Sequence, residues 1–305
     1  MAITAVHKRQ LMRDGRLYIY DTGSNRLIQT LDQPSRVSTI AFLGRGDRLL
    51  TAGWDDGLRI FSGSPLAEVA SFPNDPSRST AFWLAATPDG KRVAAGSSSG
   101  MPRLWDVDAK KATPLPKSTV LLGGIALSPD GKNLAVAFMA PRIEVYDTIT
   151  AMRADVFDSE GGAYTSVRYS PDGRVLAAGI LNDGGERQLH IWDCEAKRIR
   201  HVCAAGSVSD VRQLAFTPDS KYVVTMTVDD RKAATGGRNP VRRIELLVWS
   251  VVTGDLAQRV GLDDAGGTEF ALSPTGNALV TIGDDGSVRK WDFTRLRADL
   301  QRRKE

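Results

Sequence analysis

The side chains that could carry out chemistry in this sequence are few and scattered. Paired carboxylates occur at Asp55-Asp56, Asp229-Asp230, Asp263-Asp264 and Asp284-Asp285. Carboxylates that converge on one point are the ligands that hard divalent cations prefer, and a bound cation could activate water for hydrolysis. Three of these pairs adjoin turn glycines, however, where aspartate is ordinary turn chemistry. We therefore predict no metal site and no other cofactor.

The two cysteines and three histidines offer little more. Cys194 and Cys203 flank a predicted hairpin in which His190 lies opposite Cys203 and His201 lies opposite Trp192. In that register the two cysteines would be ~13 Å apart, which is too far for a disulfide. A pair of one histidine and one cysteine lacks the four ligands of a structural zinc site. Motifs for a serine nucleophile, a phosphate-binding loop and a zinc protease are absent.

Composition sets the class of protein. The chain has 305 residues, of which 42% are hydrophobic and 25% charged, values that fit a soluble globular protein. No apolar run approaches the ~18 residues that a membrane helix needs, and the first residues do not form a secretory signal. We therefore expect a cytoplasmic protein without a membrane segment. The net charge of +4 is too small to imply nucleic acid.

Two markers recur along the chain and indicate internal repeats. The first is an alternating apolar stretch that ends in an aromatic residue followed by Asp or Ser. Its aromatic residues are Tyr20, Phe61, Trp105, Tyr146, Trp192, Trp249 and Trp291. Successive aromatics are 41–46 residues apart except for one interval of 57. The second marker is a turn, and it occurs as TPDG at 87–90, SPDG at 128–131, SPDG at 170–173, TPDS at 217–220 and SPTG at 273–276.

These markers predict four short antiparallel strands in each repeat. Proline at the second position of the turn presets its φ angle, and Asp and Gly tolerate the turn backbone. An apolar stretch rich in β-favouring residues follows each turn. Each repeat thus reads as strand a, the P-D-G turn, strand b, a loop, strand c with the aromatic residue, a turn and strand d. Four strands in ~40–45 residues are typical of a propeller blade.

The markers resemble those of the WD-repeat family of β-propellers. Three repeats contain the Trp-Asp pair itself, at Trp105-Asp106, Trp192-Asp193 and Trp291-Asp292. The Gly-His pair of the family is absent, so the repeats are also similar to those of less regular, bacterial-type propellers. The resemblance covers nearly the whole chain. It implies a β-propeller that holds partner proteins.

The predicted fold is all-β, with seven blades of four-stranded antiparallel sheet in a single domain over residues 1–305. The first blade is incomplete, because residues 2–12 can supply a strand b but leave no room for a strand a. Residues 293–305 suit either a short helix or a last outer strand. An unpaired strand edge in the first blade would invite another chain, so self-association is an expected outcome. The chain could be a piece of a longer protein or a ring that closes imperfectly.

The most distinctive loop follows strand b of the repeat with the 57-residue interval. It is VDDRKAATGGRNPVRR, at 228–243, and its basic residues are Arg231, Lys232, Arg238, Arg242 and Arg243. Such a loop could be a basic arm that meets an acidic protein or a phosphate-bearing partner. It could equally be a solvated insertion, since surface loops tolerate added residues.

Three further residues are candidates for partner binding. Because strands alternate in direction, b–c and d–a loops emerge at one face, and Trp54 and Asp55 lie in a b–c turn. Trp83 lies on an inner strand and could line the mouth of a central channel or pack in the core. We predict a non-catalytic protein-interaction scaffold that binds through this face. The alternative is a hydrolase or lactonase-like propeller enzyme with a divalent metal in the channel, and nucleic-acid binding ranks last because no aromatics interleave with the basic residues.

Overall fold

The structure of the protein, a computed structural model, consists largely of β-strands. It describes residues 3–6, 15–21, 23–24, 26–34, 37–43, 47–53, 57–72, 81–97, 102–116, 118–181, 187–204, 210–229, 243–262, 269–282 and 288–294. Within these ranges the only helical residues are Phe293 and Thr294. They are also the only described residues of the segment 293–305, which the sequence predicts as a short helix or a last outer strand. No helix in the same ranges has the length and apolar character needed to cross a membrane.

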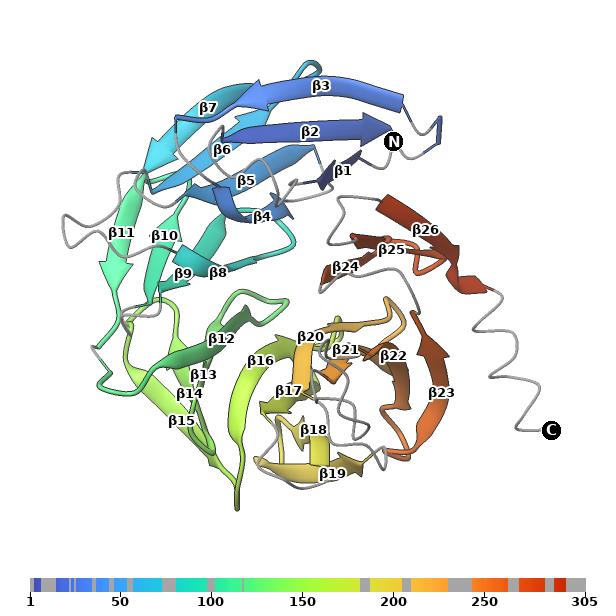
Figure 1. The fold of residues 1–305 in the computed structure, drawn as a ribbon. Coiled ribbons are helices and arrows are strands. Elements are labelled where there is room, and N and C mark those ends of the chain that lie inside the picture. Colours follow the sequence, from blue (N-terminus) through green and yellow to red (C-terminus); the bar gives the residue numbers. More distant parts are fainter. Residues whose placement is uncertain are drawn as a thin grey trace, which may run out of the picture. The chain divides into compact units, whose positions relative to one another are not determined.

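The strands form antiparallel sheets in chain order (Figure 1). Five sheets have four strands: β4(Val37–Leu43) to β7(Ala67–Phe72) with β5(Arg48–Gly53) and β6(Leu58–Ser62) between them; β8(Ala81–Ala86), β9(Arg92–Ser97), β10(Arg103–Asp106) and β11(Lys111–Pro114); β12(Leu122–Leu127), β13(Asn133–Phe138), β14(Arg142–Asp147) and β15(Arg153–Asp158); β16(Ala163–Tyr169), β17(Val175–Leu181), β18(Arg187–Asp193) and β19(Arg198–Ala204); and β20(Asp210–Phe216), β21(Tyr222–Asp229), β22(Arg243–Ser250) and β23(Leu256–Gly261). These four-stranded sheets are the blades of a β-propeller, as the repeats predict.

The first and last sheets have three strands each among the described residues. The first contains β1(Ile3–Val6), β2(Arg16–Asp21) and β3(Arg26–Asp32), and the last contains β24(Glu269–Leu272), β25(Ala278–Ile282) and β26(Val288–Asp292). Among the described residues the first sheet shows no strand a, which agrees with the prediction of an incomplete first blade, and β1 pairs with β2 as its strand b. The described part of the last sheet contains strands a, b and c but no strand d. The prediction of seven four-stranded blades is therefore wrong, because the repeat markers locate strands a, b and c but not the outer strand.

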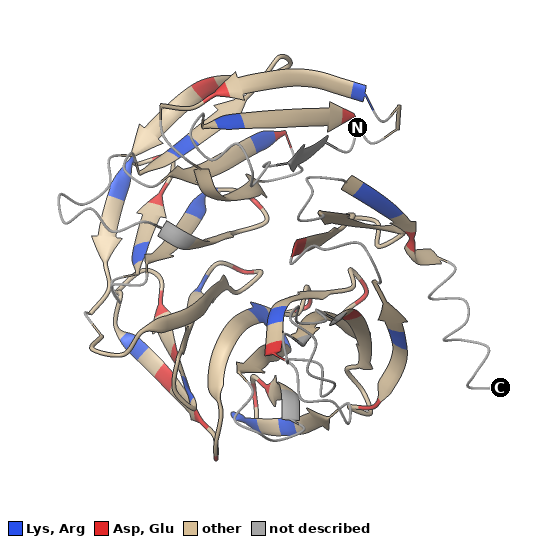
Figure 2. Cartoon of the chain, viewed as in Figure 1, with Lys and Arg blue, Asp and Glu red and all other residues tan. Residues whose placement is uncertain are grey.

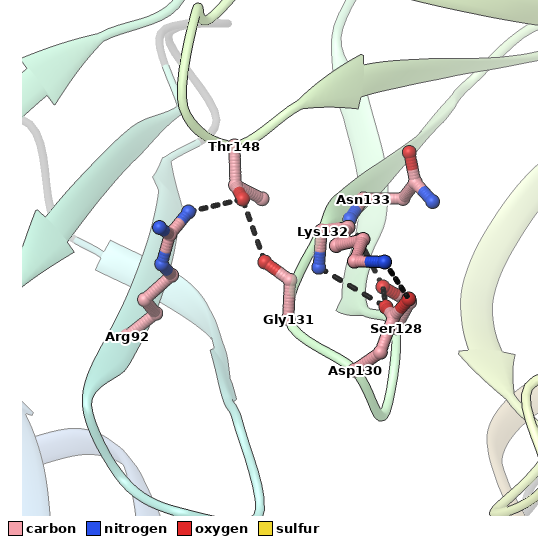
Figure 3. A network of polar contacts seen from close by, with 7 residues as sticks. All are labelled: Arg92, Ser128, Asp130, Gly131, Lys132, Asn133 and Thr148. Carbon is pink, nitrogen blue, oxygen red and sulfur yellow. Dashed lines mark hydrogen bonds and ion pairs between the residues drawn. The ribbon is translucent and has the colours of Figure 1, made fainter.

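The P-D-G turns join strands a and b through side chains as well as backbone. In the turn of Figure 3, the Ser128 hydroxyl donates to Asp130 Oδ1 at 2.6 Å, and the same carboxylate oxygen accepts from Lys132 N at 3.1 Å. Ser128 Oγ itself accepts from Asn133 N at 2.9 Å. Gly131 has a φ of 70°, which explains the glycine of the marker. The first residue of the turn must therefore carry a hydroxyl.

The same bonds recur in other sheets. The hydroxyl of the first turn residue donates to the aspartate at three further turns, which are Thr87–Asp89, Ser170–Asp172 and Thr217–Asp219. At the last turn the aspartate is replaced by Thr275, whose hydroxyl lies 3.2 Å from Ser273 Oγ. The repeated serine or threonine thus fixes the start of strand b.

In five repeats the aromatic marker is followed by an aspartate that caps the turn between strands c and d. Asp147 Oδ1 accepts from the backbone of Ile149 at 2.9 Å and of Thr150 at 2.7 Å, and Asp193 does the same for its own turn. Four residues after the capping residue the backbone turns left-handed, as at Ala151 with a φ of 57° and Gly254 with a φ of 78°. The aspartate of the Trp-Asp pair is therefore a turn-forming residue.

A single backbone bond ties these two turns together in five of the sheets. In the sheet of Figure 3 the Thr148 amide donates to Lys132 O at 2.9 Å, and the Thr148 hydroxyl donates to Gly131 O at 2.6 Å while it accepts from Arg92 of the preceding sheet. Equivalent backbone bonds are Val107 N–Lys91 O, Cys194 N–Arg174 O, Val251 N–Lys221 O and Phe293 N–Asn277 O. In these sheets the a–b and c–d turns form one hydrogen-bonded end, and we call the corresponding end of any sheet the turn end.

The chain divides into two compact units. Unit 1 comprises residues 1–136 and 144–156, and unit 2 comprises residues 137–143 and 157–305. In unit 1 an apolar cluster lies between the sheets of β4–β7 and β8–β11, with Ile60 and Trp105 among its buried members. In unit 2 a similar cluster includes Trp249 and Leu214. Each unit thus gains its core by packing neighbouring sheets against one another. A single domain over residues 1–305 stays a prediction.

Candidate interaction surface

The end of each sheet opposite the turn end carries the b–c and d–a loops, and we call it the loop end. Strand a begins there, and in four sheets its pairing with strand b is interrupted by a β-bulge near the start of the strand. The bulged residues are Ser38, Phe82, Thr165 and Arg212. A bulge inserts one unpaired residue and redirects its side chain, so these positions are suited to contacts beyond the sheet.

Two of the bulged side chains are used to hold the strand in place. The Ser38 hydroxyl donates to Ala52 O at 2.9 Å in unit 1. In unit 2 the Thr165 hydroxyl donates to Val211 O at 2.5 Å and links β16 to β20. These hydroxyls satisfy carbonyl groups that the bulge would otherwise leave without a ladder partner.

Arg212 differs from these two because its side chain is exposed. Its guanidinium lies 3.4 Å from Asp210 Oδ2, with 45% of the Arg212 side chain open to solvent. An ion pair at such exposure contributes little to stability. The pair therefore offers both signs of charge at the loop end of β20, where a partner could reach them.

A second arginine lies on the neighbouring inner strand. Two residues before the first residue of each turn, five repeats have alanine, and these are Ala41, Ala85, Ala126, Ala215 and Ala271. The sixth has Arg168, whose guanidinium donates to Val167 O at 2.8 Å. Burial lowers the pKa of this guanidinium. Sequence reasoning missed Arg168, although comparing this position between repeats would have found it.

Trp83 is the one predicted aromatic contact that the described residues include. It is on β8 directly after the bulge and pairs with Gly96 of β9. Its side chain is half-buried, so it belongs neither to the core nor to the open surface. Trp83 thus lies on an inner strand near the loop end. Its role in binding stays a prediction.

Most of the other predicted contact residues lie outside the described residues. These are Trp54, Asp55, Arg231, Lys232, Arg238 and Arg242. Arg243 is placed, but in strand β22, where it pairs with Asp229. The predicted loop boundaries at 228 and 243 are therefore wrong, because β21 and β22 continue through eight successive pairs from Tyr222↔Ser250 to Asp229↔Arg243.

A buried polar chain lies in unit 2. The Tyr164 hydroxyl donates to Ser159 Oγ at 2.8 Å and lies 2.8 Å from His190 Nδ1. Trp192 stacks edge-on against the imidazole of His190 at 6.2 Å between ring centroids. Burial raises the pKa of Tyr164 to about 12, so its phenol stays protonated at neutral pH. We interpret this chain as a structural link between β16 and β18.

The cysteines are both free and chemically quiet. Burial raises the pKa of Cys194 and of Cys203 to about 12. The thiolate is the reactive form, so neither residue is a nucleophile at neutral pH. The predicted register of their hairpin is wrong by one residue, since Cys203 pairs with Leu189 and His201 with Ile191. The turn of the hairpin lies one residue earlier than predicted, so Trp192 pairs with Ile199 instead of His201, and a bulge between Ile191 and Trp192 reduces the error to one residue beyond it.

The acidic pairs lie almost entirely outside the described residues, so the prediction of no metal site stays a prediction. Asp55-Asp56, Asp263-Asp264 and Asp284-Asp285 fall outside the described residues, as does Asp230. Within the described ranges no group of three or more His, Cys, Asp or Glu side chains could hold a metal ion. Charged side chains occur on many strands, with both signs present (Figure 2).

Comparison with known proteins agrees with the fold. Residues 25–62 and 155–193 match the family described as WD domain, G-beta repeat. Protein HIR1 of Yarrowia lipolytica is 24% identical over 243 residues, which is 74% of this chain and 20% of HIR1. The chain thus spans about a fifth of this relative.

Two solved structures share the architecture. A chain of Kuenenia stuttgartiensis hydrazine synthase superimposes with a TM-score of 0.73 and 21% identity, covering 87% of this chain and 79% of that one. A chain in the crystal structure of the mitotic checkpoint complex gives a TM-score of 0.72 and 18% identity, covering 92% of this chain and 82% of that one. At these identities the likeness is one of fold.

Proposed function

Because this chain is a WD-repeat β-propeller, we propose that it is a non-catalytic protein-interaction scaffold that binds its partners through the loop end of its blades. Propellers of this family generally bind proteins, and one structural neighbour is a chain of the mitotic checkpoint complex. The partner is a protein, and an acidic one suits the basic residues of the 228–243 segment. A location in the cytoplasm stays a prediction.

The observation that carries this proposal is the contrast between the two ends of each sheet. At the turn end, side chains such as Ser128 and Asp130 are engaged in bonds that form the turns. At the loop end, bulges redirect side chains, and Arg212 and Trp83 remain partly exposed. Side chains that stay partly open to solvent at the ends of a rigid sheet can contact a partner.

The test compares equal losses of charge at the two ends. The loop-end variant changes Arg231, Lys232, Arg242 and Arg243 to Ala. A matched turn-end variant changes Lys91, Lys132, Arg174 and Lys221 to Ala, which removes the same number of positive charges. Each tagged protein is purified from its own cells, and co-purifying proteins are quantified by mass spectrometry.

We expect the loop-end variant to lose co-purifying proteins that the turn-end variant and the wild type retain. Thermal unfolding should be almost unchanged in the loop-end variant, because three of its residues lie between β21 and β22 and Arg243 is the first residue of β22, and such substitutions usually change stability little. Equal recovery of all proteins by both variants would contradict the role of the basic segment.

The second candidate is a propeller enzyme with a divalent metal, because one structural neighbour is hydrazine synthase. Metal analysis of the purified protein, with and without chelator, separates the two. A stoichiometric divalent ion whose removal lowers the melting temperature would favour the enzyme. A partner that binds equally well after chelation would favour the scaffold.

A further inference from the structure

The P-D-G turns contain a dipeptide with a chemistry of its own. Aspartate is followed directly by glycine at 89–90, 130–131 and 172–173. In such a pair the glycine amide nitrogen can attack the aspartate carboxyl carbon, because glycine has no side chain to shield that nitrogen. A C–N bond forms, the amide proton and the carboxyl hydroxyl leave as water, and a five-membered succinimide results.

Water then opens the succinimide at one of its two carbonyl carbons. Attack at the former side-chain carbon restores aspartate, whereas attack at the backbone carbon gives isoaspartate, whose main chain runs through the former side chain. One water is released and one is consumed, so isoaspartate has the same mass as aspartate. The reaction therefore needs no oxidant, reductant or cofactor.

The turn favours glycine at the position where it permits this reaction. Gly90, Gly131 and Gly173 have φ angles of 67°, 70° and 73°, in the left-handed region that glycine adopts without strain. At Gly131 an added Cβ would also lie 2.9 Å from Thr87 Cγ2 of the preceding sheet. The backbone of the turn thus maintains a reactive dipeptide in three repeats.

Burial does not protect these aspartates. The Asp130 side chain is 54% open to solvent, and Asp89 and Asp172 are exposed as well. The water that opens the ring can therefore reach all three sites, and any protection must come from the geometry of the turn.

Ring closure requires rotation about two bonds of the aspartate, Cα–C and Cα–Cβ, and the turn of Figure 3 restrains both. Gly131 N donates to Ser128 O at 2.9 Å, which fixes the peptide plane after Asp130. Asp130 Oδ1 accepts from Ser128 Oγ at 2.6 Å and from Lys132 N at 3.1 Å, which fixes the carboxylate. These bonds must break before the nitrogen can approach the carboxyl carbon.

The other two turns have the same restraints. Gly90 N donates to Thr87 O at 2.8 Å, and Gly173 N donates to Ser170 O at 2.9 Å. The hydroxyls of Thr87 and Ser170 donate to the aspartate of their own turns at 2.5 Å and 2.6 Å. The geometry is therefore a property of the repeat and is present in both units of the chain.

The protonation of the carboxyl acts in the same direction. A carboxyl oxygen leaves as water only from the protonated acid. The Ser128 hydroxyl holds the pKa of Asp130 below its ordinary value of 3.8, so at a given pH above that value less of the acid form is present than in an unfolded chain. The same hydroxyl thus restrains the carboxyl and keeps it ionised.

We propose that Asp89, Asp130 and Asp172 are modification sites at which isoaspartate forms once the hydroxyl bond of the turn is lost. At Asp130 the product would lengthen the main chain by one methylene and displace Gly131 and Lys132. Their carbonyl oxygens accept from Thr148 Oγ1 at 2.6 Å and from Thr148 N at 2.9 Å. Isomerisation would therefore separate the a–b turn from the c–d turn of that sheet.

The decisive variant is Ser128→Ala, which removes the hydroxyl and keeps the Asp-Gly pair. Ser128→Thr is the matched control, because threonine keeps the hydroxyl and serves in the turn of Thr87. Each purified protein is incubated at mildly acidic pH below its melting transition. Isoaspartate is quantified at each site by liquid chromatography and mass spectrometry of peptides, and in total by methyl transfer from labelled S-adenosylmethionine with a protein isoaspartate methyltransferase.

A second control lies in the turn where serine follows the aspartate. Thr217 donates to Asp219 Oδ1 at 2.6 Å, and Ser220 has a φ of 57°, so the bond and the backbone are alike. The Ser220 side chain shields the attacking nitrogen. Thr217→Ala therefore removes the hydroxyl where the following residue disfavours the reaction.

We expect isoaspartate to form at Asp130 about tenfold faster in Ser128→Ala than in the wild type. The rates at Asp89 and Asp172 of the same chain should be unchanged, Ser128→Thr should behave as the wild type, and Thr217→Ala should form little isoaspartate. Circular dichroism and the melting temperature verify folding. If Ser128→Ala proves unfolded, Ser170→Ala replaces it, with Asp172 as the site measured.

An end-blocked peptide of residues 125–135 gives the rate without the turn, and its comparison with the wild type needs no variant. Isomerisation of folded wild type at Asp130 as fast as in this peptide would overturn the proposal. So would an unchanged rate in a folded Ser128→Ala protein, or an equal increase at all three aspartates, which would assign the effect to general loosening. Partner binding is not measured here, so a negative result leaves the proposed function standing.

Discussion

Trp249 donates a hydrogen bond from its indole Nε1 to the hydroxyl of Thr225 across strands β22 and β21, at 3.0 Å. Trp291 and Thr281 form the same bond at 3.0 Å in the last sheet. In the sheet of Trp192 the corresponding residue of strand b is Ala178, which has no acceptor. Of these three repeats, the last two have the Trp–Thr bond and that of Trp192 does not.

Replacing Thr225 with Val should destabilise the protein by about 1–3 kcal/mol, because it leaves the buried indole donor of Trp249 without its acceptor. The urea midpoint of unfolding measures the loss. Thr281→Val is the comparison, and it should cost less than about 1 kcal/mol, since Trp291 is only half-buried and water can replace the bond. Equal losses in the two variants would show that burial does not set the cost.

Gln213 acts as a clamp between β20 and β24. Its amide donates to Phe270 O at 2.8 Å and accepts from Phe270 N at 2.7 Å. Gln213→Leu removes both bonds and should cost about 1–3 kcal/mol. Hydrogen exchange should accelerate at residues 269–272, while exchange in β12–β15 should be unaffected. Gln213→Glu keeps the acceptor, so its stability should lie between that of the wild type and that of Gln213→Leu.

The left-handed residue after the c–d turn predicts opposite effects at two equivalent positions. Ala151 has a φ of 57°, so Ala151→Gly should stabilise the protein by about 0.5–1 kcal/mol. Gly254 has a φ of 78°, and an added Cβ would lie 2.7 Å from His201 Cγ. Gly254→Ala should therefore destabilise by about 1–2 kcal/mol or more. Thermal melts of both variants verify the signs, and a less stable Ala151→Gly protein would contradict the strain.

The turn carboxylates predict a loss of stability in acid. The Thr87 hydroxyl holds the pKa of Asp89 below its ordinary value of 3.8, and the Ser128 hydroxyl does the same for Asp130. A carboxyl whose pKa is lowered by folding contributes stability above its ordinary pKa, and that contribution disappears as the pH falls through the folded value. The melting temperature should therefore decrease below pH ~4.

The control for this acid dependence is the pair Asp89→Asn with Asp130→Asn. The amide oxygen still accepts from the turn, but the side chain does not titrate in acid. The double variant should be somewhat less stable at neutral pH. It should also lose less stability on acidification than the wild type, which differential scanning fluorimetry can follow. An identical acid profile would show that other carboxyls dominate.

The sequence predicted the repeats well because their markers are residues that the turns require. A hydroxyl before proline and an aspartate after it, as at Ser128 and Asp130, are bonded to the backbone in the same way in successive sheets. The aromatic residue marks strand c, and the WD-repeat resemblance followed from its spacing. These signals are local, so a single sequence contains them.

Other features depend on contacts that no local pattern encodes. The turn of the β18–β19 hairpin lies one residue earlier than predicted, and a bulge between Ile191 and Trp192 changes the register again. The outer strand carries no marker, which is why the predicted number of four-stranded blades was too high. Candidate contacts such as Trp54 and the 230–242 segment stay predictions, because they lie beyond the described residues, and Arg168 stands out only when repeats are aligned.

The bond between Thr148 N and Lys132 O, with its counterparts in the other sheets, has a consequence for engineering the protein. Two hairpin turns that share a bond cannot lengthen independently, whereas the β13–β14 connection is bonded, from Ser159 N to Pro141 O at 3.0 Å, to the segment after β15 and not to the a–b or c–d turn. Foreign peptide grafted between Met139 and Pro141 should therefore preserve the blade, while the same graft between Ser128 and Asn133 should disrupt it. Insertions should therefore be tolerated at the loop end of the blade and not at its turn end.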